Sequence, residues 1–243
     1  MSENLEPIRY SMITEKNPRE IVMLRGSGCV WKRCRFCDYH LDKSLDKEAN
    51  FLLNRTQLLQ VTGLYHKLEV INSGSFVDLD EDTISLIEEV CLKKDISEIH
   101  FECHWMHRKE IPAFRKRFAD KGITLKLKIG VETFDSLFRE SYLSKGIDTD
   151  SPAEIAQYFD EVCLLQGIPG QTVESMRQDI ETGLQFFERV CVNIMVENRM
   201  PIKPDPRVIA LFQKYLYPDY INNPRVDILM ENTDFGVGGT ANA

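Results

Sequence analysis

Short apolar runs alternate along the chain with segments in which apolar residues recur every three or four positions. The runs predict buried strands at 21–24, 68–71, 96–103, 125–131, 162–166 and 192–196. The range 125–131 is the weakest of these because leucine and lysine alternate in it. A further short run at 226–230 is a weaker strand candidate.

The segments between the runs carry apolar stripes at helical spacing, which we interpret as core packing. The stripes are Leu58, Val61 and Tyr65; Ile84, Ile87 and Cys91; Ile111, Phe114 and Phe118; Phe134, Phe138 and Tyr142; and Val173, Met176, Ile180, Leu184 and Phe187. Asp80 and Asp82 are expected to cap the second stripe and Thr172 the last one. Asp205-Pro206 is expected to begin a final helix, with proline at its preferred first position.

Strands that alternate with helices predict an α/β fold with a parallel sheet and right-handed crossovers. Six β–α units are too few for a closed eight-stranded barrel, so we expect a curved, open sheet, a partial (βα)6 barrel. We expect a single domain over 1–243, with a core at about 18–217 and a C-terminal tail, 218–243, capping the barrel. The active site is then expected in the loops that follow the carboxyl ends of the strands.

The charge balance favours a small-molecule substrate over nucleic acid. The 243 residues include 30 Lys and Arg against 38 Asp and Glu, a net charge of −8, whereas nucleic-acid binding depends on cationic side chains. We interpret the one basic run, Arg115-Lys116-Arg117, as a solvated helix face. The sequence has neither an apolar run of the roughly 18 residues that a membrane span needs nor an apolar signal core, which predicts a cytoplasmic protein.

Three of the seven cysteines, Cys29, Cys34 and Cys37, lie within nine residues directly after the first predicted strand. Three thiolates suit zinc, with a fourth ligand such as His40, or a [4Fe–4S] cluster with one iron left open. The position of the loop at the catalytic end of the sheet favours the cluster. Cys91, Cys163 and Cys191 stand among apolar neighbours and are interpreted as buried small hydrophobes.

The C-x4-C-x2-C loop after the first strand resembles the radical S-adenosylmethionine (SAM) superfamily. The usual spacing in that superfamily is C-x3-C-x2-C, so this loop is one residue longer and indicates a divergent subfamily. The resemblance implies that Cys29, Cys34 and Cys37 hold a [4Fe–4S] cluster whose open iron binds SAM. It also implies reductive cleavage of SAM to a 5′-deoxyadenosyl radical, with an electron donor such as flavodoxin or ferredoxin.

The same resemblance assigns the SAM-binding residues. Phe36, just before the third cysteine, is expected to pack by the adenine. The stretch Asn72, Ser73, Gly74 and Ser75 stands where the superfamily usually has Gly-Gly-Glu and is expected to receive the SAM amino group. Glu132 is expected near the ribose or the methionine end of SAM. The turn Gly167-Ile168-Pro169-Gly170-Gln171-Thr172 resembles the G-x-P-G-x-T turn near the adenine, which implicates Gln166 and Ile168.

The loop from Arg25 to Trp31 resembles radical SAM enzymes that act on 7-deazaguanine derivatives. A short protein without added domains is most similar, among these, to the queuine lyase family. That resemblance implies cleavage of the C–N bond of queuine to release 7-aminomethyl-7-deazaguanine in queuosine salvage. The alternatives are a radical SAM enzyme that modifies a tRNA or peptide, and a non-enzymatic zinc or iron–sulfur module.

Substrate residues can be suggested only from position along the strands. The segment after the third strand offers Trp105 as a stacking surface and His104 or His107 as proton donors. The competing interpretation of this segment is a packed tryptophan with surface histidines. Glu197 and Asp234 are the candidates for a carboxylate that binds the guanidine-like edge of the base.

Overall fold

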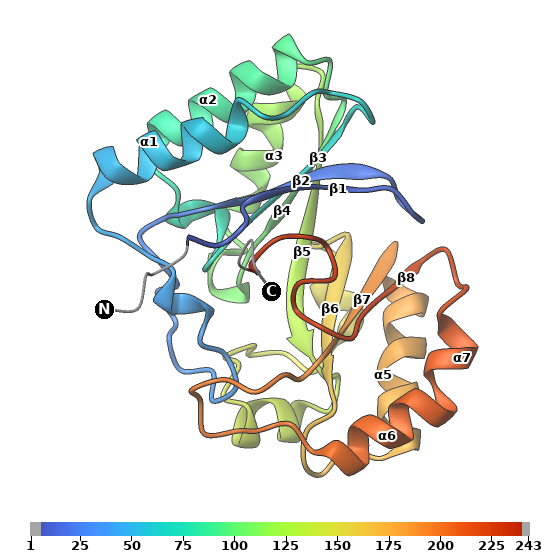
Figure 1. Cartoon of the computed structure of the whole chain (residues 1–243). Helices are drawn as coiled ribbons and strands as arrows, with labels where there is room; N and C mark the ends of the chain where they lie inside the picture. Colours follow the sequence, from blue (N-terminus) through green and yellow to red (C-terminus); the bar gives the residue numbers. More distant parts are fainter. Residues whose placement is uncertain (1–5, 240–243) are drawn as a thin grey trace.

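The computed structural model describes residues 6–239 and shows one eight-stranded sheet curved into a half-barrel with helices on its outer face (Figure 1). The strands follow one another in sequence order from β1 to β8. The first two, β1 (Tyr10–Ile13) and β2 (Arg19–Leu24), pair antiparallel, and every later pair is parallel. The others are β3 (Lys67–Asn72), β4 (Glu98–Glu102), β5 (Thr124–Glu132), β6 (Glu161–Gln166), β7 (Arg189–Ile194) and β8 (Val226–Leu229).

The helices connect the parallel strands. They are α1 (Lys47–Leu58), α2 (Glu81–Lys93), α3 (Ile111–Ala119), α4 (Pro152–Ile155), α5 (Val173–Phe186), α6 (Pro206–Tyr215) and α7 (Tyr217–Tyr220). Short helical turns occur at η1 (Tyr39–Leu41), η2 (Phe76–Asp78), η3 (Trp105–His107) and η4 (Phe138–Tyr142). The predicted caps Asp80 and Thr172 are present: Asp80 accepts from the Thr83 N–H and Thr172 from that of Ser175. Asp82, also expected to cap, lies instead inside the first turn of α2, because the helix already begins at Glu81. The final helix begins at Pro206 as predicted, with Asp205 accepting from the Arg207 N–H.

The predicted partial barrel and its six strands are confirmed, and the weaker candidate at 226–230 is β8. Because β8 belongs to the sheet, the core extends beyond residue 217, where it was expected to end. The antiparallel edge strand β1 was not predicted, since only four partly exposed residues form it.

Two helix predictions need correction. Helix α1 ends at Leu58, before Val61 and Tyr65, because the backbone then turns at Thr62 and Gly63, whose N–H groups donate to Glu20. The stripe over 134–142 forms only the single π-helical turn η4.

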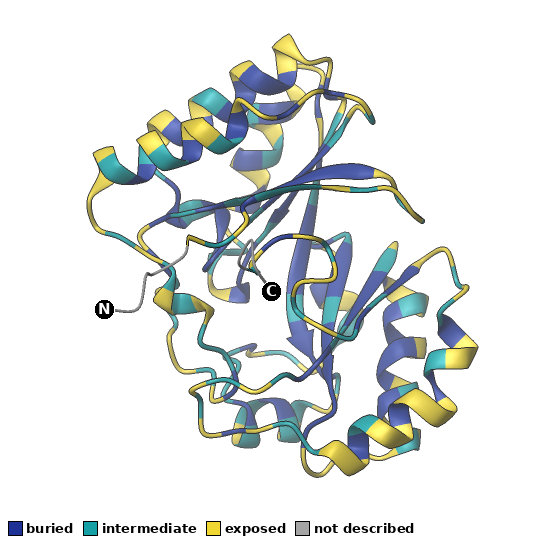
Figure 2. Cartoon of the chain, in the orientation of Figure 1, coloured by how far each residue is buried: buried dark blue, intermediate teal, exposed yellow. Residues whose placement is uncertain are grey.

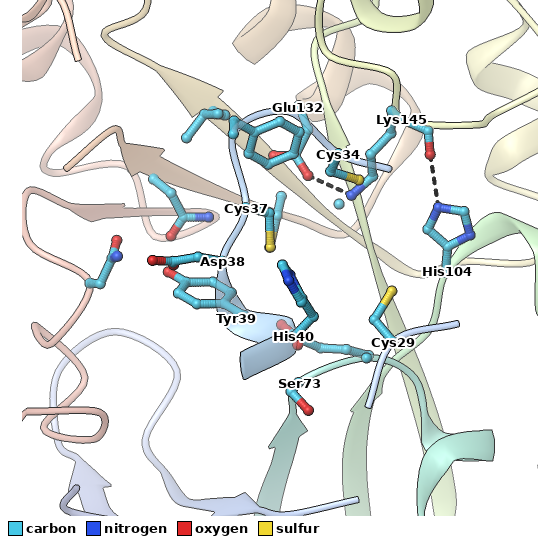
Figure 3. A pocket seen from close by; sticks show the side chains of 18 of the residues that line it. Cys29, Cys34, Cys37, Asp38, Tyr39, His40, Ser73, His104, Glu132 and Lys145 are labelled. Carbon is cyan, nitrogen blue, oxygen red and sulfur yellow. Dashed lines mark hydrogen bonds and ion pairs between the residues drawn. The ribbon is translucent and has the colours of Figure 1, made fainter. Parts of the chain in front are cut away.

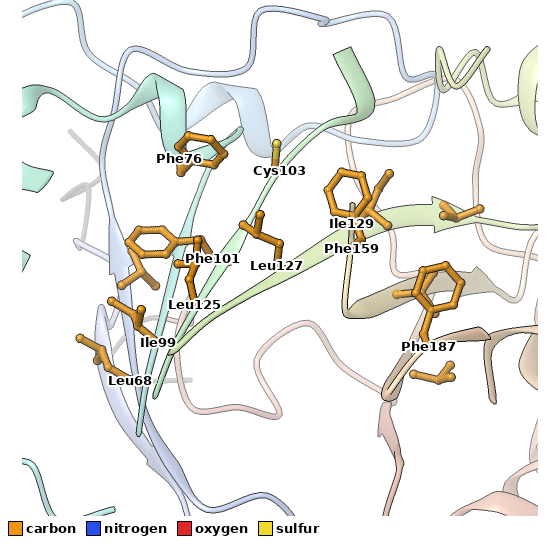
Figure 4. Close-up of a cluster of buried hydrophobic side chains, with 14 of the residues drawn as sticks. Leu68, Phe76, Ile99, Phe101, Cys103, Leu125, Leu127, Ile129, Phe159 and Phe187 are labelled. Carbon is orange, nitrogen blue, oxygen red and sulfur yellow. The ribbon is translucent and has the colours of Figure 1, made fainter. Parts of the chain in front are cut away.

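The outer face of the sheet and the inner faces of α2, α3 and α5 form the main apolar core (Figures 2 and 4). Alternate residues of β5, Leu125, Leu127 and Ile129, point into this core and are fully or almost fully buried. The lysines between them, Lys126 and Lys128, therefore face the barrel interior. The Leu/Lys alternation that weakened the sequence prediction thus reflects a strand with one apolar and one polar side.

Ion pairs fill the lower part of the barrel interior. Glu69 on β3 accepts from Arg19 Nε at 2.5 Å and also from the ammonium group of Lys128. His100 on β4 lies 3.3 Å from a carboxylate oxygen of Glu161. These side chains are almost completely buried, so the base of the barrel is a closed layer of paired charges below the mouth.

The segment after β8 crosses the open side of the half-barrel between β1 and β8 (Figure 1). Its backbone pairs with the N-terminal segment, where Ile8 N–H donates to the Gly239 carbonyl at 2.7 Å and Gly238 N–H donates to that of Ile8 at 2.8 Å. Phe235 lies 5.0 Å from the guanidinium of Arg19. The tail therefore covers the open side of the half-barrel; residues 240–243 of the predicted cap, 218–243, lie outside the described residues.

Candidate active site

A pocket opens at the carboxyl ends of the parallel strands, where the fold predicted the active site. It encloses about 1150 Å³, including the part that is open to solvent. Its walls come from the cysteine loop after β2, the loops after β3, β4, β5 and β7, and Asn232 of the tail.

All three loop cysteines line the pocket (Figure 3). Burial raises the pKa of the Cys34 thiol to about 11 and that of Cys37 to about 12, with the nearby Lys145 charge acting in the opposite direction. Metal coordination would displace these protons outright. His40, the fourth ligand of the zinc alternative, also lines the pocket. Among residues 6–239, no three His, Cys, Asp or Glu side chains, the loop cysteines included, are gathered closely enough to hold a single metal ion.

The loop after β3 presents unsatisfied acceptors beside the cysteine loop. Asn72, Ser73 and Gly74 line the pocket, and the buried Asn72 Oδ1 and Ser73 Oγ atoms have no hydrogen-bond partner among the described residues. A Cβ on Gly74 would clash with an Asp78 carboxylate oxygen and lie 3.0 Å from the backbone N and Cα of Cys29, so glycine is needed for this close approach. Buried polar atoms are normally paired, so these two predict a ligand that donates hydrogen bonds.

Ser75, the fourth residue of this predicted stretch, is already engaged behind the pocket wall. Its hydroxyl accepts from the His104 N–H at 2.9 Å, and its own N–H donates to Asp78 at 2.7 Å. Ser75 is therefore placed to fix the loops after β3 and β4 relative to each other, and its hydroxyl does not face the cavity.

Glu132 and Lys145 form a buried ion pair in the pocket wall, with the ammonium 2.7 Å from Glu132 Oε1 (Figure 3). Glu132 has a φ of +70° beside an irregularity in the β5–β6 register, a backbone conformation that is strained for a residue with a side chain. Burial opposes the charge on Lys145, but Glu132 and Cys34 hold its pKa above the ordinary value. The sequence prediction included Glu132 and missed Lys145.

Of the three residues predicted to lie near the adenine of SAM, one lines the pocket and two lie behind its wall. Phe36 lines the pocket, and the Lys145 ammonium lies 5.6 Å from its ring centre. Ile168 is fully buried in a small cluster behind Phe36. Gln166 is also fully buried outside the pocket, and its amide donates to the Met176 carbonyl at 3.0 Å.

His104 lines the pocket, but both of its ring nitrogens are engaged. Nε2 lies 2.8 Å from the Lys145 carbonyl, which can only accept, so Nδ1 is the acceptor for the Met106 N–H. Burial and the Lys145 charge lower the pKa of His104 to about 4, so the ring is neutral at physiological pH. His104 therefore positions Lys145 and has no spare proton to donate.

The remaining predicted substrate residues do not line the pocket. Trp105 is 1% exposed, packs on Tyr158 and Phe159, and donates to Asp148, so its ring offers no stacking face. This matches the competing interpretation of a packed tryptophan, and His107 likewise lies outside the pocket.

The two acidic candidates are also elsewhere. The side chain of Glu197 is 70% exposed and pairs with Lys203 at 2.6 Å. Asp234 lies in a separate hollow beside β1 and accepts from the Glu231 N–H. Asn232, two residues earlier, is the tail residue that reaches the pocket.

Inward-facing residues at the ends of the strands form the floor, and sequence analysis missed them. They are Glu102 on β4, Lys128 on β5, Cys163 on β6 and Asn193 on β7. The interpretation of Cys163 as a buried small hydrophobe is therefore wrong, because its position on β6 faces the pocket and leaves it only partly buried. The available signal was the alternation in β5: once Leu127 and Ile129 are assigned to the outer core, Lys128 must face inward. The same alternation makes Glu102 an inward residue of β4, and the strand register pairs it with Lys128 on β5.

No model of a known protein family matches the sequence, and no curated protein matches it. A solved structure, the queuine lyase from Clostridium spiroforme bound to SAM and queuine, is 42% identical and superposes with a TM-score of 0.92. The match covers 96% of this chain and 100% of that one. A glycosylase-like protein, ydhD from Bacillus subtilis, has 10% identity and a TM-score of only 0.34, which carries no weight. Identity at this level over the full length of both proteins, on the predicted partial barrel, shows that this chain belongs to the queuine lyase family.

Proposed function

We propose that this protein is a radical SAM queuine lyase that cleaves the C–N bond in the side chain of queuine and releases 7-aminomethyl-7-deazaguanine. The observation that carries the proposal is the full-length likeness, at 42% identity, to a queuine lyase bound to SAM and queuine. The pocket adds independent support, because it combines three cysteines, unsatisfied acceptors and a polar floor in one cavity.

The pocket residues fit the [4Fe–4S] cluster and SAM that this reaction requires. Cys29, Cys34 and Cys37 would hold three irons of the cluster, and the unpaired Asn72 Oδ1 and Ser73 Oγ beside them are acceptors for the SAM amino group. When bound, SAM and the reduced cluster would supply the 5′-deoxyadenosyl radical needed to take a hydrogen from the substrate. The hard chemistry thus belongs to the cofactors, and the protein binds, orients and encloses them.

The ion pair of Glu132 and Lys145 is proposed to bind the polar end of SAM. It is held in place from two sides, since the His104 ring donates to the Lys145 carbonyl and the Lys145 ammonium stands over Phe36. A bound carboxylate would gain the charge of Lys145, and a bound ribose or ammonium group that of Glu132. Ser75, Ile168 and Gln166 are proposed to support this wall from behind.

An acidic one-electron carrier such as flavodoxin or ferredoxin is the proposed electron donor. Lys32, Arg33 and Arg35 are exposed on the cysteine loop of a protein whose net charge is −8. A local basic patch of this kind attracts a negatively charged partner close to the cluster ligands.

All seven cysteines are free thiols, which supports the proposal that the protein works in a reducing compartment, the cytoplasm. No helix among the described residues is long and apolar enough to cross a membrane.

The test is anaerobic incubation of the reconstituted protein with SAM, dithionite and free queuine, followed by mass spectrometry. We expect 5′-deoxyadenosine and 7-aminomethyl-7-deazaguanine to form together. If SAM is cleaved only when a queuosine-containing tRNA replaces the free base, the alternative of a tRNA-acting enzyme is correct.

A further inference from the structure

Three carboxylates line the pocket among the described residues, and two of them already have partners. Asp38 accepts from the Arg199 N–H at 3.3 Å, and Glu132 is paired with Lys145. Glu102, at the end of β4, has no hydrogen bond or ion pair with any described residue. It is therefore the pocket carboxylate that is open to a ligand.

The ion pairs below the floor keep Glu102 free. Its register partner on β5 is Lys128, but the Lys128 ammonium is bound to Glu69 one layer deeper. Burial raises the pKa of Glu102 to about 7, with the Lys128 charge acting in the opposite direction. A carboxylate in this position is poorly solvated and unpaired, so a ligand that donates hydrogen bonds to it gains more than it would in water.

We propose that Glu102 binds the pyrimidine edge of the 7-deazaguanine base, accepting two parallel hydrogen bonds from the ring N–H and the exocyclic amino group. This inference rests on the proposed function. The edge carries two adjacent donors and matches a carboxylate in bidentate fashion. Glu102 thus has the role predicted from the sequence for Glu197 or Asp234, neither of which reaches this cavity.

The same geometry separates the substrate from the adenine of SAM. The corresponding edge of adenine presents an amino donor next to an unprotonated ring nitrogen, so one carboxylate oxygen would face an acceptor. A site built around a carboxylate therefore rejects adenine and accepts guanine-like bases, because the wrong base leaves a buried charge unpaired. Glu102 thus directs the base to the floor and leaves the mouth, near the cysteines, to SAM.

The experiment compares wild type, Glu102→Gln and Glu102→Asp, with Glu197→Gln as the matched control because that carboxylate is exposed outside the pocket. Each protein is assayed with queuine and with a queuine analogue that lacks the exocyclic amino group. Iron content and the Kd for SAM are measured alongside.

In Glu102→Gln, one carboxylate oxygen is replaced by an amide NH2 group, which would face an N–H donor of the base. We expect the KM for queuine to rise roughly 10- to 100-fold, as for loss of a charge-assisted hydrogen bond, with the iron content and the Kd for SAM unchanged. Glu102→Asp should give a smaller rise, and Glu197→Gln none. With wild type, the KM for the analogue should exceed that for queuine by a similar factor. In Glu102→Gln the KM for the analogue should be little higher than that for queuine, because the loss of the amino group and the substitution remove the same contact.

An unchanged KM for queuine in Glu102→Gln, or a loss confined to kcat, would overturn the assignment. If that variant fails to assemble its cluster, the test is made with the wild type alone. Equal wild-type KM values for queuine and the analogue would then overturn the assignment of Glu102. These results remain distinct from a failure of the proposed function, in which the wild type would not cleave queuine at all.

Discussion

Replacing Glu69 with glutamine removes the anion that two buried cations share. The Glu69 side chain is 2% exposed, and it binds Arg19 at 2.5 Å on one oxygen and Lys128 on the other. The variant leaves both cations at the base of the barrel without their main partner. Removing one member of a buried ion pair typically costs about 3–5 kcal/mol.

That cost is large enough to measure by calorimetry. For a protein of this size, each kcal/mol lowers the Tm by about 2–4 °C, so Glu69→Gln should lower it by roughly 6–20 °C. The matched control is Glu89→Gln, which breaks an exposed i,i+4 pair with Lys93 and should cost less than about 1 kcal/mol. A Tm for Glu69→Gln within about 2 °C of the control would refute the reasoning, since ΔΔG values of that size are ordinary for surface changes.

The effect also has a pH signature. Burial alone would raise the pKa of Glu69, but the charges of Lys128 and Arg19 hold it well below the ordinary value of the carboxyl group. The ionised carboxylate therefore stabilises the fold fully above its unfolded-state pKa of about 4.3, and this stabilisation is lost as the pH falls further. We expect the difference in Tm between wild type and Glu69→Gln to narrow in acid and to be constant near neutrality.

The candidate site and the proposed electron donor give four further predictions. Replacing all three loop cysteines with alanine should abolish cluster binding, measured as iron and sulfide content; full iron retention, or stoichiometric zinc in the native protein, would contradict the assignment. Glu132→Ala should weaken SAM binding by about 1.5–3 kcal/mol in calorimetry while iron content stays constant. Gly74→Ala should lower cluster occupancy after reconstitution, because the new methyl group would clash with the Asp78 carboxylate and crowd the Cys29 backbone at 3.0 Å. Turnover supported by flavodoxin should fall with rising ionic strength, whereas turnover with dithionite should not; equal salt dependence would argue against a basic docking patch.

The periodicity of the sequence was sufficient to predict most of the fold. Continuous apolar runs predicted the central strands, and capping residues such as Asp80 and Thr172 predicted helix starts that the structure has. The four-residue elements β1 and α4 were missed because so short a segment shows no period; β8, equally short, was found only through its apolar run. The end of α1 was misplaced because it depends on Glu20, which is distant in sequence and binds the turn after the helix.

The candidate site was predictable where local order in the sequence determines it. The three cysteines and Asn72 to Gly74 each follow a strand directly, and the structure places them in one pocket. The substrate side was not predictable in this way, because loop residues after a strand can turn into the core, as Trp105 does. Glu102 occupies the last inward position of β4, one residue before Cys103. Only the strand register shows that it lies beside Lys128 of β5 in the pocket floor.

The central claim is that SAM and queuine meet in this one pocket and that the radical acts on the side chain of queuine. The most direct measurement uses queuine deuterated on its cyclopentenediol ring, incubated anaerobically with the reconstituted protein, SAM and dithionite. We predict that 5′-deoxyadenosine gains deuterium as 7-aminomethyl-7-deazaguanine is released. Formation of 5′-deoxyadenosine without deuterium, with the labelled queuine recovered intact, would contradict the account.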